Sequence, residues 1–205
     1  MKRFLAIVTL LLLCEVGIGQ NRWTIQPDGK SIRMDATTVS LPHSDHVEMS
    51  GKMMAVVLYW NVNDEGRFGL DRSLVFPMLR TIPNNTHASL MLRQNLDLVA
   101  QLRINNNNRL KFTTRYVELN GLMRVVEEHR ASTYGLEVER VIFPTMEQQM
   151  MCEHYVLRNT GTIAYALQIP ELSQTITTDA ARGVKGSYKI VTTTKGGGVY
   201  NIKPG

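Results

Sequence analysis

The stretch LEVERVIF, residues 136–143, alternates between two sets of side chains along an extended chain. Leucine, valine, arginine and isoleucine fall on one side, and glutamate, glutamate, valine and phenylalanine fall on the other. A period of two residues is that of a β-strand, whose successive side chains point to opposite faces of a sheet. The stretch therefore predicts a strand.

The same alternation recurs along the chain, at residues 111–116, 122–127 and 188–194. Runs rich in Asn, Gly and Thr separate the alternating stretches, at residues 61–66, 105–108 and 159–162. Asn120-Gly121 predicts a type I′ hairpin turn. No stretch keeps a long 3.6-residue period, and residues 95–102 predict at most one helical turn. The pattern predicts an all-β fold, an antiparallel β-sandwich formed by residues 20–205 as one domain.

The last residues, Lys203-Pro204-Gly205, contain a turn dipeptide. A turn is normally followed by another strand. We therefore expect the sandwich to lack its last strand or strands within this chain.

Residues 1–19 have the pattern of a signal peptide. Lys2 and Arg3 precede an apolar run, and Gly17-Ile18-Gly19 provides the small residues of a cleavage site. The pattern predicts secretion to the periplasm or the extracellular space. The alternatives are a membrane anchor, for which the run is short, and a lipoprotein signal at Cys14. We expect no further membrane span.

The composition is that of an ordinary globular protein of 205 residues, 43% hydrophobic and 20% charged. Two cysteines exclude a disulfide scaffold. The net charge is +5, but the basic residues are interspersed with acidic ones, and this pattern argues against a nucleic-acid partner.

Sequence motifs for nucleotide binding, serine hydrolases and zinc proteases are absent. The segment His43-Ser44-Asp45-His46 comes closest to a metal site, but it is better explained as a polar loop before a strand. We predict no metal and no cofactor. Glu137 and Glu139 share one face of a strand and could form a glycosidase pair, although a solvated sheet face has the same pattern.

Residues 76–90 carry the densest set of hydrogen-bonding side chains, between and after two prolines. Such donors and acceptors suit sugar hydroxyls, and Tyr59 and Trp60 could provide an aromatic ring for stacking. A well-bonded bend between strands would explain the same segment. The candidate carbohydrate-binding residues are Trp60, Arg80, Asn84, Asn85 and His87. No catalytic residue is assigned.

Several of these strings resemble the N-terminal region of large secreted proteins from Gram-negative polysaccharide degraders. The strings are residues 48–52, 70–88, 143–144, 152–159 and 186–188. Proteins of that kind resemble six-hairpin glycosidases, in which an N-terminal β-sandwich precedes an (α/α)6 toroid. The resemblance would cover most of residues 22–205, and it implies a supersandwich-like fold.

The resemblance implies that the chain is the N-terminal β-sandwich of a glycoside hydrolase-like protein acting in polysaccharide breakdown. In such enzymes the catalytic acid and base lie in the helical toroid, which this chain does not contain. The chain alone is therefore expected to be non-catalytic, a fragment whose partners are an oligo- or polysaccharide and a toroid encoded downstream. The alternatives are a free-standing carbohydrate-binding module and a compact hydrolase that uses Glu137 and Glu139.

Overall fold

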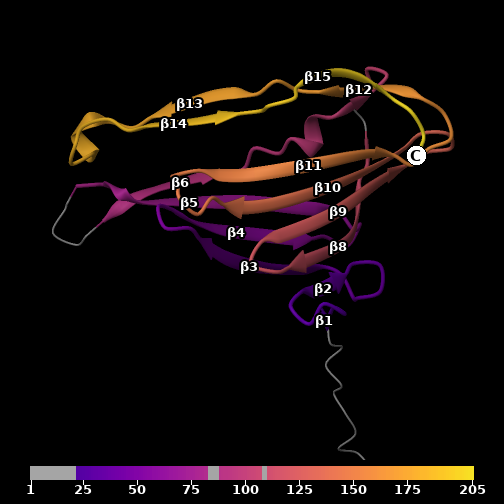
Figure 1. The fold of residues 1–205 in the computed structure, drawn as a ribbon, viewed down its shortest axis with the longest axis horizontal. Coiled ribbons are helices and arrows are strands. Elements are labelled where there is room, and N and C mark those ends of the chain that lie inside the picture. The colour runs from indigo at the N-terminus through magenta and orange to yellow at the C-terminus, as the bar shows by residue number, and fades with distance from the viewer. Residues whose placement is uncertain (1–21, 83–87, 108–109) are drawn as a thin grey trace, which may run out of the picture.

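The computed structural model describes residues 22–82, 88–107 and 110–205. These residues form antiparallel β-sheets and no α-helix, and the all-β prediction is confirmed (Figure 1). The 3₁₀ turns within the described ranges are η2 (Val99–Gln101) and η3 (Ala180–Arg182). The predicted signal peptide lies outside the described residues.

Two sheets make up most of the fold. The larger has the order β1-β2-β8-β9-β10-β11 and consists of β1 (Thr24–Ile25), β2 (Ile32–Asp35), β8 (Thr113–Leu119), β9 (Met123–Arg130), β10 (Gly135–Pro144) and β11 (Met151–Asn159). The second is a meander of β3 (His43–Ser50), β4 (Ala55–Val62), β5 (Phe68–Arg80) and β6 (Ser89–Gln94).

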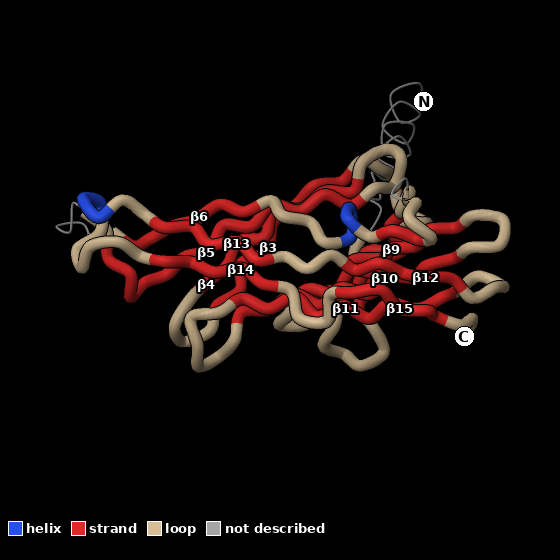
Figure 2. Tube along the Cα trace, turned by 90° about the horizontal axis from the view of Figure 1, so that it is seen from above, coloured by secondary structure: helices blue, strands red, loops and turns tan. Residues whose placement is uncertain are grey.

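Two smaller sheets complete the molecule. The three-stranded sheet has the order β15-β12-β7 and consists of β15 (Gly198–Ile202), β12 (Tyr165–Ile169) and β7 (Arg103–Ile104). The hairpin pairs β13 (Ser173–Thr177) with β14 (Lys189–Thr193). The molecule is elongated, with β4–β6 and the β13–β14 hairpin in one half and β12 and β15 in the other (Figure 2).

The main hydrophobic core lies between the four-stranded and six-stranded sheets. Alternate residues of β4 supply one side of it, and alternate residues of β9 and β10 supply the other. Its fully buried members include Val56, Leu58, Val62, Val117, Met123, Val125 and Ile142. The face-to-face packing of two antiparallel sheets around one apolar layer is that of a sandwich.

A second core lies between the six-stranded and three-stranded sheets. Leu136 and Val138 of β10 pack there with Leu167 of β12. Both cores therefore share one face of β10, and Arg140 lies on that face between Val138 and Ile142. The junction of the two cores thus holds a charged side chain.

Most of the predicted turns are found at the expected positions. Asn105 and Asn106 adopt positive φ angles of 48° and 64° after β7. The Asn120-Gly121 turn joins β8 to β9, but only Gly121 has a positive φ, of 66°. Because a type I′ turn needs positive φ at both central residues, the predicted turn type is wrong. One added residue, Leu122, separates this glycine from β9.

We expect Gly51→Ala to destabilise the protein by about 1–3 kcal/mol, because the new methyl group would overlap backbone atoms. A Cβ at Gly51 would lie 2.0 Å from the Thr145 carbonyl oxygen. A Cβ at Gly69 would instead meet the end of the Asn61 side chain, which can rotate away. Denaturant unfolding of both alanine variants tests the contrast, and equal losses of stability would contradict it.

Candidate functional site

The outer face of the four-stranded sheet carries a shallow groove of about 680 Å³. It runs across β3, β4 and β5 and is lined by Ser44, Asp45, His46, Tyr59, Trp60, Asn61, Gly69, Leu70 and Asp71. Side chains of β4 point alternately into the core and outward, and this alternation explains which residues line the groove. Leu58, Trp60 and Val62 point into the core, so Tyr59 and Asn61 point outward.

Tyr59 lies at the centre of this face and is 44% exposed. The strand register places His46 of β3 on one side of it and Asp71 of β5 on the other. The His46 ring stacks on Tyr59 with centroids 6.0 Å apart, and the Arg93 guanidinium lies 5.8 Å from the Tyr59 ring centre. Contacts on both sides hold the ring in place while part of it remains open to solvent.

The polar groups beside Tyr59 are not used within the fold. Among the described residues, the side chains of Asn61 and Asp71 and the Tyr59 hydroxyl have no hydrogen bond or ion pair. Gly69 lies opposite Asn61, and the absence of a side chain there leaves room for the Asn61 amide. The groove thus combines an aromatic ring with exposed donors and acceptors that the described residues leave without a partner, a combination suited to a polar ligand with an apolar face.

The sequence-predicted carbohydrate residues do not form one site among the described residues. Trp60 is only 2% exposed, and its ring packs in the core against Trp23, His43 and Phe68. Its predicted role as a stacking surface is corrected, because the β4 alternation turns Trp60 inward and Tyr59 outward. Asn84, Asn85 and His87 lie outside the described residues.

Arg80 ends β5 and is half-buried. Its carbonyl oxygen accepts hydrogen bonds from the Tyr188 hydroxyl at 2.6 Å and the Val184 amide at 3.0 Å. These contacts join the end of β5 to the loop between β13 and β14. Arg80 therefore lies at the far end of β5 from Gly69 and Asp71, which line the groove.

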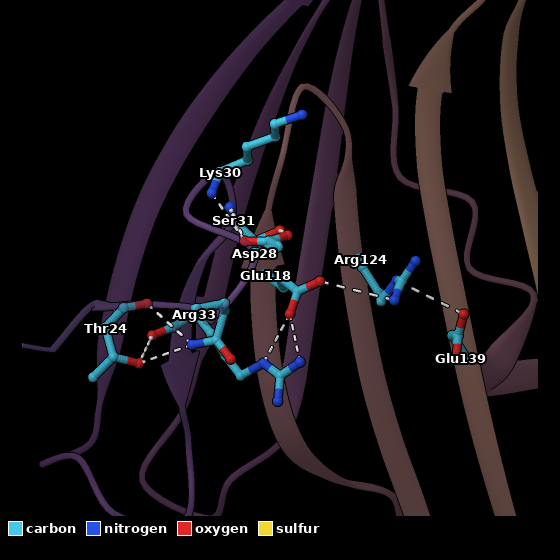
Figure 3. A network of polar contacts seen from close by, with 9 residues as sticks. Thr24, Asp28, Lys30, Ser31, Arg33, Glu118, Arg124 and Glu139 are labelled. Atoms are coloured by element: carbon cyan, nitrogen blue, oxygen red, sulfur yellow. Dashed lines mark hydrogen bonds and ion pairs between the residues drawn. The ribbon is translucent and has the colours of Figure 1, made fainter.

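The outer face of the six-stranded sheet has a different character, because its charges pair across strands (Figure 3). Glu118 lies between Arg33, at 2.5 Å, and Arg124, at 3.8 Å. The proposed glycosidase pair belongs to the same network. Glu137 contacts Arg158 at 2.7 Å, and Glu139 lies 3.7 Å from Arg124. Both carboxylates thus serve as partners of arginines.

A buried charge cluster lies at the junction of the two cores. Arg140 has no exposed surface, and one of its nitrogens lies 3.0 Å from Glu127 and 3.1 Å from Asp97. Burial raises the pKa of Glu127 to about 7, with Asp97 adding to the rise and Arg140 opposing it. The pKa of Arg140 is raised as well: burial opposes its charge, but Glu127 and other acidic groups outweigh burial. Arg140 therefore stays charged, and Glu127 titrates near neutral pH.

A second buried arginine bridges the two large sheets. Arg72 of β5 donates a hydrogen bond from Nε to Glu153 of β11, which also accepts one from Tyr155 at 2.5 Å. Burial acts to raise the pKa of Glu153, but Arg72 outweighs it and the net shift is downward. This cluster is enclosed between the sheets, so we assign it to sheet packing.

The remaining predicted sites are quickly placed. Residues 43–46 begin strand β3, so their interpretation as a loop before the strand is wrong. Within the described part of the chain, no group of three or more His, Cys, Asp or Glu residues could hold a metal ion. The same residues include no helix that is long and apolar enough to cross a membrane.

Comparison with known proteins adds no identity: no family model, no curated protein and no solved structure matches the chain. Function therefore has to be argued from the geometry of the groove and the charge clusters.

Sequence reasoning did not select His46, Asn61 and Asp71 as neighbours of Tyr59. The turn predicted at residues 61–66 indicates a hairpin and so makes the two flanking strands neighbours. It does not give their register: a hairpin symmetric about the centre of residues 61–66 would pair Tyr59 with Phe68, whereas the observed partner is Asp71. His46 gave no such signal, because no turn is predicted in residues 51–54, which connect β3 to β4.

Proposed function

We propose that the protein is a non-catalytic carbohydrate-binding β-sandwich that acts in polysaccharide breakdown outside the cytoplasm. The observation that carries this proposal is the exposed Tyr59 ring within a groove whose neighbouring polar groups, Asn61 and Asp71, have no partner among the described residues. Sugars offer apolar C–H faces for aromatic rings and hydroxyls for amides and carboxylates.

The resemblance to the sandwich region of six-hairpin glycosidases supports the same class of ligand. In that arrangement the sandwich would hold a polysaccharide beside a separate helical catalytic toroid. A free-standing binding module remains the alternative, and the groove would serve either arrangement. In both, the catalytic acid and base lie outside this chain.

Isothermal titration calorimetry against cellohexaose, mannohexaose, laminarihexaose and maltohexaose tests the proposal. We expect at least one to bind, and we expect Tyr59→Ala to weaken that binding by about tenfold or more, because the stacking surface is removed. Tyr200→Ala is the matched control: Tyr200 is also 44% exposed, but it lies on β15.

Two outcomes would count against the proposal. The first is no binding to any of the four oligosaccharides by protein whose far-UV circular dichroism shows folded β-structure. The second is equal weakening by Tyr59→Ala and Tyr200→Ala, which would place binding elsewhere or make it non-specific.

A further inference from the structure

The groove around Tyr59 differs in charge from the chain as a whole. The chain carries a net charge of +5, and a basic protein attracts acidic polysaccharides in general. The described residues that line the groove include Asp45 and Asp71 and no lysine or arginine. The groove is therefore acidic, whereas the protein as a whole is basic.

Asp71 is the side chain that sets this local charge. Asp45 already accepts a hydrogen bond from the His46 amide at 2.8 Å and lies 4.0 Å from His43. Asp71 has no hydrogen bond or ion pair among the described residues, whereas Glu118, Glu128, Glu137 and Glu139 on the other large sheet all face arginines. An ionised carboxylate only accepts hydrogen bonds, so Asp71 is suited to ligand groups that donate them.

Hydroxyl groups of a neutral sugar can donate to both oxygens of such a carboxylate, and hydrogen bonds to a charged acceptor are the stronger kind. A uronate or sulfate group has no proton to donate at neutral pH and would place a second negative charge beside Asp71. The same carboxylate that holds a neutral sugar therefore repels an acidic one.

Among the described residues, Arg93 is the basic group that contacts the Tyr59 ring. Its guanidinium lies 5.8 Å from the ring centre, and it projects from β6 beyond the strands that line the groove. In this position it supports the ring through a cation–π contact. Arg93 is also the alternative that the test has to exclude. If Arg93 held an acidic glycan in the groove, that binding would contradict the repulsion by Asp71.

Resting on the proposed carbohydrate-binding function, we infer that the groove selects neutral saccharides over uronate-bearing ones, and that Asp71 makes the selection.

The test compares two ligands that differ only at C6. They are the neutral hexasaccharide that binds best in calorimetry and the same oligosaccharide oxidised at C6 to the uronate. We expect the oxidised form to bind the wild-type protein about tenfold more weakly or worse at low salt, because the two charges repel. Raising the salt concentration should narrow the difference.

The Asp71→Asn variant separates charge from shape. It should bind the neutral ligand less tightly than wild type, and it should lose most of the discrimination against the oxidised ligand. Arg93→Ala should leave the discrimination in place.

The inference fails if the oxidised ligand binds the wild-type protein as tightly as the neutral one, or if Arg93→Ala weakens binding of the oxidised form while binding of the neutral form is unchanged. In either case carbohydrate binding itself would stand. If neither ligand binds while the protein is folded, the proposed function fails, and the inference fails with it.

Discussion

Arg140→Ala should lower the free energy of unfolding by about 3–5 kcal/mol, because it leaves the buried Glu127 carboxyl group without its cation. Glu127 and Asp97 both lie within 3.1 Å of the Arg140 guanidinium, and Glu127 is buried between the cores. Loss of the side chain would also open a cavity on the β10 face that both cores share. Guanidinium chloride unfolding at pH 8 measures the effect.

The control is Arg158→Ala, on the neighbouring strand β11. Arg158 also pairs with a glutamate, Glu137, but it is exposed to solvent, and exposed ion pairs contribute little. A second variant distinguishes charge from volume. Replacing Arg140 with Met and Glu127 with Leu together should recover most of the stability lost in Arg140→Ala. Equal losses in Arg140→Ala and Arg158→Ala would contradict the account of the buried cluster.

The contribution of Glu127 to the stability of the protein should fall as the pH rises from about 4.5 to about 7. His43, whose pKa is lowered by burial, contributes in the opposite direction. Burial raises the pKa of Glu127 from its ordinary value of 4.5 to about 7. The folded state therefore keeps the Glu127 proton through a range in which the unfolded state has already released it. The stabilising effect is complete below pH 4.5 and is lost as the pH passes through the folded-state pKa. A difference of that size between the pKa values of Glu127 in the folded and unfolded states corresponds to about 3 kcal/mol of unfolding free energy.

The buried carboxyl group of Glu153 does not act in the same window. The pKa of Glu153 is lowered, so its contribution is lost only below pH 4.5. We expect Glu127→Gln to remove the loss of stability that Glu127 causes between about pH 5 and about pH 7.5, measured as the difference from wild type by urea unfolding at several pH values. Glu137→Gln, at an ion pair on the outer face, is the control for the removal of a carboxylate. An unchanged slope in Glu127→Gln would show that another group titrates.

Strand positions were predictable because each follows from its own residues. The alternation in residues 136–143 predicts β10 correctly, and the same rule explains why Trp60 points inward while Tyr59 points outward. Applied to residues 55–62, that rule would have removed Trp60 from the list of candidate binding residues.

The contacts between sheets could not be predicted in this way. Arg140 meets Asp97, 43 positions away, and Arg72 meets Glu153, 81 positions away. Such pairs depend on how the sheets stack, which strand periodicity does not encode. The groove has an intermediate status: the turn predicted at residues 61–66 makes β4 and β5 neighbours, but neither their register nor the pairing of β3 with β4 was predicted.

The most direct test of carbohydrate binding by the outer face of the four-stranded sheet is an NMR titration of the ¹⁵N-labelled protein. The ligand is the neutral hexasaccharide that binds best in calorimetry. We predict that amide shift changes cluster in β3, β4 and β5 around His46, Tyr59 and Asp71, and that they are absent from the Tyr59→Ala variant. Shift changes centred on Tyr200 and β15, or changes that persist in Tyr59→Ala, would contradict the assignment of this face as the binding site.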